Sequence, residues 1–506
     1  MIYTTQAEKS RSSTLDARRY SRGVTVMLVL AFMGIFLFLL ATIMSYVLTQ
    51  GKYGRALNAR EQAFNISEAG LEYYRWFLAH NPSIMNAGVG LTSPYTYIVN
   101  DPEASRLGES TITATANLQC GVVQWVDLTS VGKSDQSVVF TRTLNARYMR
   151  PSVGEYSALL NANVWAGADR VISGPYFSNG GIRMDGTTNS TVQSAVATWS
   201  CDSSFGCSPT QSKNGVWGSG SGSALWSWAP NVASFNFAGI ATNFATLRGY
   251  ANSTGILLDI DRVKVGGSQQ GGTFSSVGAS DQRGYHVKLN ADNTIDVYRV
   301  TGTQGVYSVH TDNPGSWATD YDIITSETYQ GHYTIPSGCP IIYVQAKTWL
   351  EGIVGNKVTV VAADTGAYTP DIILQNNITY SSGTGSSGLT AIAERSVTIP
   401  LVSPDMMTVR GIFVAQSGYF GRNYYAETGN NAVPSAYTSY VKQTQLTTIG
   451  TVVSNGRIGT QWTCSGTYCS GFAQRIDTYD RLLAFSPPAF TPSASVDYKL
   501  VLWREQ

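Results

Sequence analysis

The chain has 506 residues, a formal net charge of +1, and 13% charged residues, against about a quarter in an average soluble domain. Hydrophobic residues make up 43% of it, and 50 glycines and 29 tyrosines accompany long Ser, Thr and Asn stretches. The near-neutral balance excludes a protein that binds nucleic acid through bulk charge, and the apolar content excludes a disordered chain. At about 100 to 200 residues per domain, the length predicts two to four units that each bury a core.

The first feature along the chain is an uncharged apolar stretch from Val24 to Leu48. At about 1.5 Å per residue, a helix of this length crosses a hydrocarbon core about 30 Å thick. The residues before it are mainly basic: Lys9, Arg11, Arg18, Arg19 and Arg22, against Glu8 and Asp16. This bias predicts a single pass through the cytoplasmic membrane, with the leader inside and the remainder outside.

A helical pattern continues beyond the predicted membrane surface until Asn81-Pro82. The apolar and small residues that keep its 3.6-residue spacing are Ala59, Ala63, Ile66, Gly70, Tyr74, Phe77 and Leu78. One helix over 24–81, half apolar and half amphipathic, is therefore expected. A secretory signal peptide fits less well, because its apolar region would be shorter and a small-x-small cleavage site would follow it.

This segment resembles type IV pilins and their pseudopilin relatives, whose precursors carry a basic leader that ends in Gly before an apolar helix. The matching residues are Arg18-Arg19-Tyr20-Ser21-Arg22-Gly23, followed by Val24-Thr25-Val26-Met27-Leu28. Downstream, Ala63 to Glu72 resembles the "AF..AEAG" stretch of one minor-pilin group. The resemblance covers roughly residues 10 to 80. It implies cleavage between Gly23 and Val24 by a prepilin peptidase, and assembly with other pilin-like subunits.

One position departs from the family pattern. Most major pilins have Glu at the fifth mature position, whereas this chain has Leu28, and in the family the loss of that Glu is associated with minor or tip subunits. The residues expected in the fibre core or membrane are Val24, Leu28, Leu30, Phe32, Phe36 and Leu40. The alternative is a plain signal-anchor helix that tethers an unrelated cell-surface binding protein.

The remainder of the chain predicts a mainly β fold. Short alternating strands up to residue 156 are typical of an antiparallel meander packed on the helix. Further on, strands of four to six residues with Gly or Asn at their corners favour a parallel β-solenoid over a β-sandwich. The predicted segments are a cytoplasmic leader (1–23), the helix (24–81), the meander (82–156), a first solenoid part (157–200), an α+β insertion (201–340), a second solenoid part (341–465) and a C-terminal tail (466–506).

The insertion carries two more local predictions. Its apolar spacing predicts a helix from Phe235 to Tyr250, and a hairpin is expected to pair 285–289 with 295–300 through an Asn/Asp-rich turn. The tryptophans Trp217, Trp226 and Trp228 near a Gly/Ser loop are candidates for an adhesive contact with a surface glycan or protein. Half-buried packing of the same tryptophans is the alternative.

All six cysteines lie in the predicted external part, which indicates disulfides. Sequence proximity favours Cys201 with Cys207 and Cys464 with Cys469, which leaves Cys120 and Cys339. No Cys-x-x-Cys motif or nearby His supports a metal site, and no cofactor motif is present.

Catalysis has weaker support in the sequence. The third functional alternative is a membrane-tethered, glycan-active β-solenoid, for which Asp259 and Asp261 on one strand face would be the first carboxylate pair to examine. The histidines, His80, His286, His310 and His332, have no nucleophile signature near them. The sequence therefore predicts a structural subunit rather than an enzyme.

Overall fold

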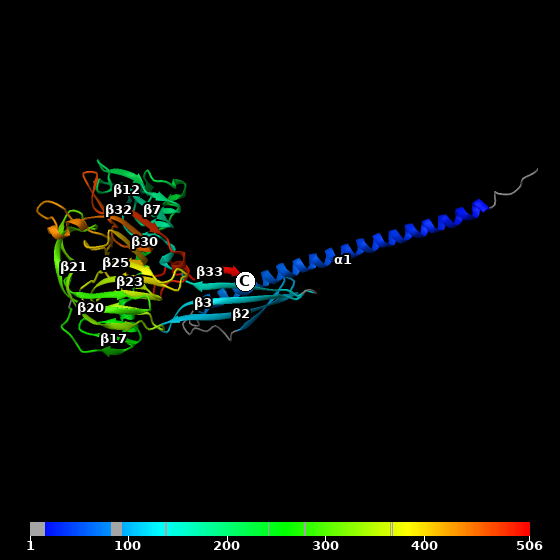
Figure 1. Cartoon of the computed structure of the whole chain (residues 1–506), viewed down its shortest axis with the longest axis horizontal. Coiled ribbons are helices and arrows are strands. Elements are labelled where there is room, and N and C mark those ends of the chain that lie inside the picture. The colour runs from blue at the N-terminus through cyan, green and yellow to red at the C-terminus, as the bar shows by residue number, and fades with distance from the viewer. Residues whose placement is uncertain are drawn as a thin grey trace, which may run out of the picture.

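The computed structural model describes residues 16–81, 94–136, 139–240, 242–277, 280–364, 366 and 368–506. Helix α1 (Asp16–His80) projects far beyond a small antiparallel sheet, and a larger β domain lies at the other end of that sheet (Figure 1). The fold is mainly β with one long N-terminal helix followed by antiparallel strands, which confirms the predicted class. Most of the predicted leader and the first residues of the predicted meander lie outside the described residues.

The small sheet, called here the stalk sheet, packs on the second half of α1. Its strands, in spatial order, are β1 (Tyr95–Asn100), β2 (Arg106–Gln119), β3 (Val122–Ser134), β4 (Thr141–Met149) and β33 (Lys499–Glu505), all antiparallel. The amphipathic face predicted from the sequence is the buried one: Ala59, Ala63, Ile66, Tyr74 and Leu78 are each at most 2% exposed. Apolar burial on one helix face therefore fixes the helix to the sheet.

Small residues bring α1 unusually close to the stalk sheet. A Cβ atom added to Gly70 would lie 2.1 Å from Ser110 Oγ and 2.6 Å from Ser130 Oγ. Ser67 Oγ donates a hydrogen bond to the Ser130 carbonyl at 3.0 Å, and Ser130 Oγ donates to the Ser67 carbonyl at 2.7 Å. This reciprocal pair satisfies buried hydroxyls at the contact, so the close approach leaves them partnered.

Beyond the stalk sheet, most strands pair in parallel and build successive coils, called here the parallel stack. The first ladder runs, in spatial order, through β16 (Ile256–Leu258), β22 (Ile341–Val344), β24 (Lys357–Ala362), β26 (Gly388–Ala393), β28 (Met406–Ala415), β30 (Lys442–Ser454), β5 (Ala158–Leu160), β8 (Tyr176–Ser178), β11 (Val192–Ser194) and β15 (Trp226–Trp228). Every pair of neighbouring strands in this ladder is parallel.

Two further ladders form the other sides of the coils. The second runs through β19 (Gly284–Leu289), β23 (Lys347–Val354), β25 (Ile372–Tyr380), β28, β30, β32 (Thr467–Thr478), β7 (Arg170–Ser173) and β10 (Thr187–Thr188). On a side branch, β27 (Val397–Thr398) pairs with β25, and β29 (Phe420–Gly421) pairs with β27. The third consists of β6 (Val164–Ala166), β9 (Ile182–Met184) and β14 (Val216–Trp217). The largest buried apolar cluster takes residues from all three ladders.

The coils are not stacked in the order of the chain. The chain enters the stack at β5, builds coils as far as β15, and passes through α3 (Phe244–Ser253) to begin again at β16 at the opposite end. It then returns until β30 lies beside β5, and short α4 (Arg481–Phe485) follows β32. Ser152 and Ser493 form an antiparallel bridge where the chain enters and leaves. The stack is thus inserted between β4 and β33.

Three sequence expectations differ from this arrangement. β32, expected in a C-terminal tail, pairs with β30 and β7 inside the stack. β16, expected within the insertion, is a member of the first ladder. The helix predicted over 235–250 begins only at Phe244, because Asn243 accepts a hydrogen bond from the Thr246 amide and caps the helix there.

Several antiparallel hairpins extend from the parallel stack. Gly284–Leu289 pairs with the start of β20 (Thr294–Val309), which confirms the predicted hairpin, and β20 continues against β21 (Trp317–Thr334). The remaining hairpins pair β16 with β17 (Val263–Val265), β17 with β18 (Ser268–Gln270), β12 (Thr198–Cys201) with β13 (Gln211–Asn214), and β31 (Gln461–Cys464) with β32.

Candidate functional sites

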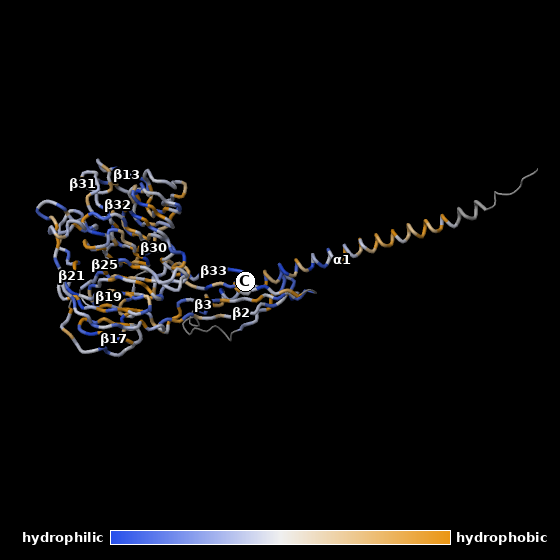
Figure 2. The backbone as a smooth tube through the Cα atoms, in the orientation of Figure 1, coloured by the Kyte–Doolittle hydropathy of each residue, from blue (hydrophilic) through white to orange (hydrophobic). Residues whose placement is uncertain are grey.

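The first candidate site is the exposed half of α1. Figure 2 shows a continuous apolar segment on the part of the helix that projects from the stalk sheet. Its predicted fibre-core residues are all solvent-exposed, between 45% for Leu40 and 64% for Phe32, with Val24, Leu28, Leu30 and Phe36 in between. The segment is long and apolar enough to cross a membrane. So large an exposed apolar surface requires a lipid or protein partner.

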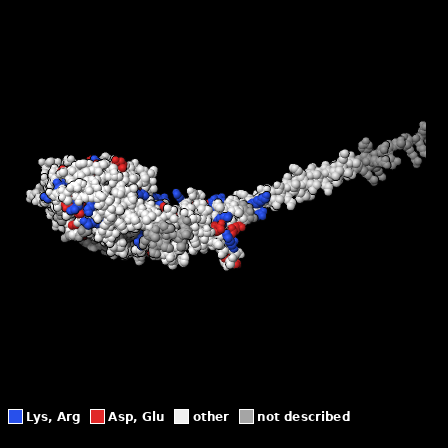
Figure 3. All heavy atoms as spheres, turned by 90° about the horizontal axis from the view of Figure 1, so that it is seen from below, with Lys and Arg blue, Asp and Glu red and all other residues white. Residues whose placement is uncertain are grey.

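Charge begins where this apolar segment ends. Between Gly23 and Gly51 the sequence has no Asp, Glu, Lys or Arg, and the next residues along α1 include Lys52 and Arg55, both exposed. Figure 3 shows the same division, with charged side chains gathered near the stalk sheet and none on the described apolar segment. Arg55 Nε donates to the Gly51 carbonyl at 3.2 Å. The boundary fits a membrane–water interface close to residue 51.

The structure places the three candidate adhesive tryptophans at one end of the parallel stack, all half-buried. Trp226 and Trp228 lie on β15, the terminal strand of the first ladder, and pack against the main apolar core. Trp217 lies on β14, with the Lys213 ammonium 4.6 Å from its ring centroid. The half-buried alternative therefore describes their setting, because the two β15 side chains cover the end of the core.

All six cysteines are paired, in the combinations that sequence proximity favoured. Cys120 and Cys339 are 219 residues apart in sequence and link the β2–β3 turn of the stalk sheet to the segment just before β22. Cys464 and Cys469 close the β31–β32 hairpin. One disulfide thus joins the stalk sheet to the parallel stack, and the others fix single loops.

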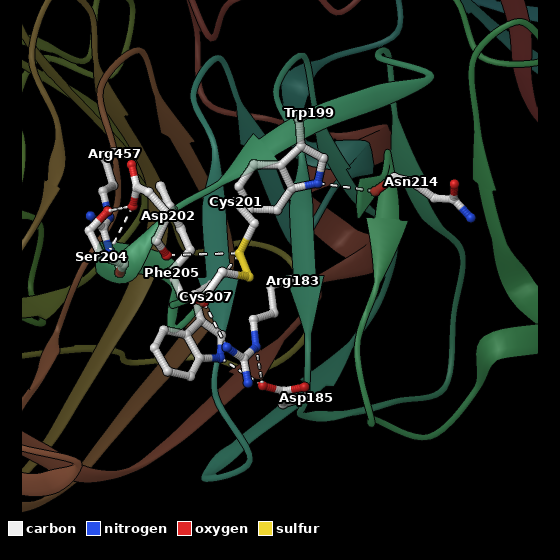
Figure 4. Close-up of a disulfide and its surroundings, with 11 residues drawn as sticks. Arg183, Asp185, Trp199, Cys201, Asp202, Ser204, Phe205, Cys207, Asn214 and Arg457 are labelled. Atoms are coloured by element: carbon white, nitrogen blue, oxygen red, sulfur yellow. Dashed lines mark hydrogen bonds and ion pairs between the residues drawn. A yellow bond between two sulfur atoms is a disulfide. The ribbon is translucent and has the colours of Figure 1, made fainter. Parts of the chain in front are cut away.

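Figure 4 shows the third disulfide, Cys201–Cys207, and the charged groups beside it. Arg183 donates to Asp185 Oδ2 at 2.7 Å and to the Phe205 carbonyl at 2.7 Å, which holds the disulfide loop on β9. On the other side of the loop, Arg457 donates to the Ser204 carbonyl at 2.7 Å. No pattern in the sequence predicts this arrangement, since Arg457 is distant along the chain from the loop.

The candidate catalytic carboxylates are not on a strand. β16 ends at Leu258, so Asp259 and Asp261 lie in the turn before β17. Asp259 pairs with Arg248 at 3.5 Å, and Asp261 forms a two-pronged pair with Arg262 at 2.7 and 2.8 Å. The shared strand face expected from the sequence does not form, because the chain turns directly after Leu258. Among the described residues, no group of three or more His, Cys, Asp or Glu could hold a metal.

Most titratable groups that form ion pairs or hydrogen bonds inside the fold stabilise the parallel stack. Lys347, only 3% exposed, bonds to Asp322 at 2.7 Å inside the fold. His310 Nε2 lies 2.8 Å from Asp320 Oδ1, and this hydrogen bond raises the pKa of His310. Burial, aided by the Arg147 guanidinium, lowers the pKa of Lys357 to about 8. Such shifts accompany structural ion pairs as well as catalytic sites.

No protein-family model matches the chain, and no curated protein matches it. Among solved structures, the crystal structure of the competence-associated pilin ComZ from Thermus thermophilus is similar, with 14% identity over 89% of this chain and 98% of that chain. The TM-score of that superposition is 0.31, which is too low to establish a common fold.

Proposed function

We propose that this protein is a structural subunit of a type IV pilus-like or pseudopilus fibre, held in the cytoplasmic membrane before assembly and displayed at the cell surface afterwards. The observation that carries the proposal is the apolar half of α1, which is exposed along its length and continuous with a half that is buried on the stalk sheet. Pilin-like leader residues that end at Gly23 stand directly before the apolar segment.

The geometry supports lateral packing of this helix in two settings. In the membrane, lipid chains cover the apolar residues; in a fibre, the helices of neighbouring subunits cover them. The stalk sheet and the parallel stack lie at the C-terminal end of α1, away from its apolar half (Figure 1). Both therefore remain outside such a helical bundle. A prepilin peptidase that cuts after Gly23 would remove the basic leader and free the Val24 amine for this packing.

We infer a minor, tip-proximal position for the subunit. A protonated Val24 amine in an apolar bundle costs at least about 2.5 kcal/mol when it has no partner. Leu28 cannot offset that charge on a neighbouring copy, although a Glu on a different pilin could offset it here. The bulky parallel stack also suits the end of a fibre better than its repeated shaft. Adhesion by this stack and the absence of enzymatic activity are part of the same proposal.

The signal-anchor alternative predicts a different product. A plain anchor would keep residues 1–23 and would stay in the membrane fraction, whether or not a pilus assembly system is present. The test is to express the full chain with and without a prepilin peptidase, and to compare the masses of the two products. Cleavage after Gly23 that a Gly23→Ala variant loses supports the fibre subunit. An uncut chain in both strains would support the anchor.

A further inference from the structure

A small cavity lies on the side of the parallel stack, between the two short disulfide loops. It has a volume of about 100 Å³ and lies among β6, β31, β32 and the loop that joins β30 to β31. Trp165 and Trp462 line it together with Thr311, Arg457 and Gln461. Small-molecule sites are typically concave, with aromatic walls and a few polar groups that converge.

Two of the lining groups, Thr311 and Arg457, have hydrogen-bonding capacity that no described residue uses. Thr311 is 3% exposed, and its Oγ1 forms no hydrogen bond within the described part of the chain. A Cβ atom on Gly459 would lie 2.8 Å from the Thr311 methyl carbon, so the methyl group packs on backbone. A buried hydroxyl without a partner costs free energy, which a ligand oxygen would recover.

Arg457 is the second such group. Its guanidinium lies 4.2 Å from the Phe205 ring centroid and donates to the Ser204 carbonyl, but no described carboxylate lies within ion-pair distance. The other arginine of the cavity, Arg475, is already paired with Asp169 at 2.6 and 2.7 Å. Arg457 therefore keeps its remaining N–H donors for an external acceptor, and a guanidinium binds a carboxylate in a two-pronged geometry.

The aromatic walls are held in place before any ligand arrives. Trp165 Nε1 donates to Asp185 at 2.8 Å, and Trp462 Nε1 donates to the Arg422 carbonyl at 2.9 Å. The Cys201–Cys207 loop carries the Ser204 and Phe205 groups that position Arg457, and the Cys464–Cys469 disulfide closes the hairpin that carries Trp462. Fixing these loops lowers the ordering cost of binding.

We propose that this cavity binds an acidic saccharide, with the sugar ring against Trp165 and Trp462 and its carboxylate on Arg457 and Thr311. The volume admits the carboxylate-bearing edge of one sugar unit, and the rest of the glycan lies outside. The site is distinct from the Trp217, Trp226 and Trp228 set. It needs no fibre assembly, so it stands or falls separately from the proposed subunit role.

The test is a ligand-observed NMR titration of the full chain in a zwitterionic detergent that has no sugar head group. The probes are a trimer of galacturonic acid and the matching neutral galactose trimer. The acidic trimer should bind at least about tenfold more tightly, because hydrogen bonds to charged groups are the stronger ones. Equal binding of both trimers, or no binding of either, would overturn the proposal.

Matched variants locate the site. Arg457→Gln should lower affinity for the acidic trimer about tenfold or more, whereas Arg299→Gln should leave it unchanged. Arg299 is a matched control, because its contacts resemble those of Arg457. Its guanidinium lies 5.2 Å from the Phe274 ring centroid and donates to the carbonyl of Ser275, the neighbour of Phe274, at 3.0 Å. Thr311→Val should weaken binding and Thr311→Ser should retain it, and this pair decides the outcome if Arg457→Gln fails to fold. Wild-type affinity in both Arg457→Gln and Thr311→Val would contradict the assignment.

Discussion

Val452 of β30 pairs in parallel with Ala158 of β5, so the last coil of the stack lies directly on its first coil in chain order. The consequence is that the chain enters and leaves the stack at the same place, where Ser152 bridges Ser493. The parallel stack is therefore an insertion into the stalk sheet, and the stalk sheet is complete without it, with β33 paired to β4.

This arrangement predicts that the stalk folds without the stack. We expect a variant in which a two-residue Asn-Gly turn replaces 153–492, with Cys120→Ser, to remain folded, because β4 and β33 then form an ordinary hairpin. Circular dichroism and a cooperative thermal transition in detergent would check it. The control inserts the same turn after Ser173, inside the second ladder, and deletes nothing; that variant should lose stability. A stalk-only chain that aggregates or never melts cooperatively would contradict the insertion.

A second prediction concerns the close contact between α1 and the stalk sheet. Gly70→Ala should destabilise the protein by about 1 to 3 kcal/mol, since the added methyl group overlaps the hydroxyls of Ser110 and Ser130. Gly54→Ala on the same helix is the control, because nothing lies within 4 Å of the added Cβ. Better helix propensity should make that variant equally or slightly more stable. Denaturant unfolding in detergent compares the two, and equal losses of stability would refute the packing explanation.

The His310–Asp320 pair predicts a pH dependence. Because the folded-state pKa of His310 is raised, its contribution is fully present below the unfolded pKa near 6.5 and is lost as the pH rises through the higher folded value. The free energy of unfolding should therefore fall between pH 6 and the region above neutrality, and less so in His310→Gln. The His80→Gln variant, changed on the exposed end of α1, should follow the wild type. An identical pH profile in His310→Gln would remove this pair from the explanation.

The lowered pKa of Lys357 predicts that the free energy of unfolding changes with pH in the opposite direction. It lies 5.7 Å from the Trp125 ring centroid and donates to Ser486, with no described carboxylate at ion-pair distance. Its pKa of about 8 means that the unfolded state binds the proton more tightly, so stability should rise from pH 7 to 10 through this group. Lys357→Met should be at least as stable as the wild type at pH 7, and the difference should shrink at pH 10. A large loss of stability at pH 7 would show that the ammonium group is needed.

The sequence predicted features that depend on neighbours along the chain. The spacing of the small and apolar residues from Ala59 to Leu78 predicted the buried helix face, and the Asn/Asp turn after Leu289 predicted the hairpin. Features that depend on distant partners were missed. Nothing local marks Val452 as the neighbour of Ala158, and Trp165 and Arg457 line one cavity only because the coils are stacked out of chain order.

The partial burial of the three candidate adhesive tryptophans could not be recognised for the same reason. A Gly/Ser-rich setting made Trp217, Trp226 and Trp228 candidates, but parallel pairing of β15 with β11 places the last two over the end of the core. The strands that carry Trp165 and Trp462 have no distinguishing sequence motif, and only the structure shows that both residues line one cavity with Arg457.

The most direct test of the subunit role is mass spectrometry of surface filaments sheared from cells that express this chain, a prepilin peptidase and a Glu-bearing pilin. We predict that the filaments contain this chain at low abundance, beginning at Val24, and that cells lacking the second pilin yield no long filaments. Leu28→Glu should increase its abundance in the fibre, since the carboxylate can then offset a neighbouring amine. Filaments free of this chain, with an uncut form that begins at Met1 confined to the membrane, would contradict the proposed function.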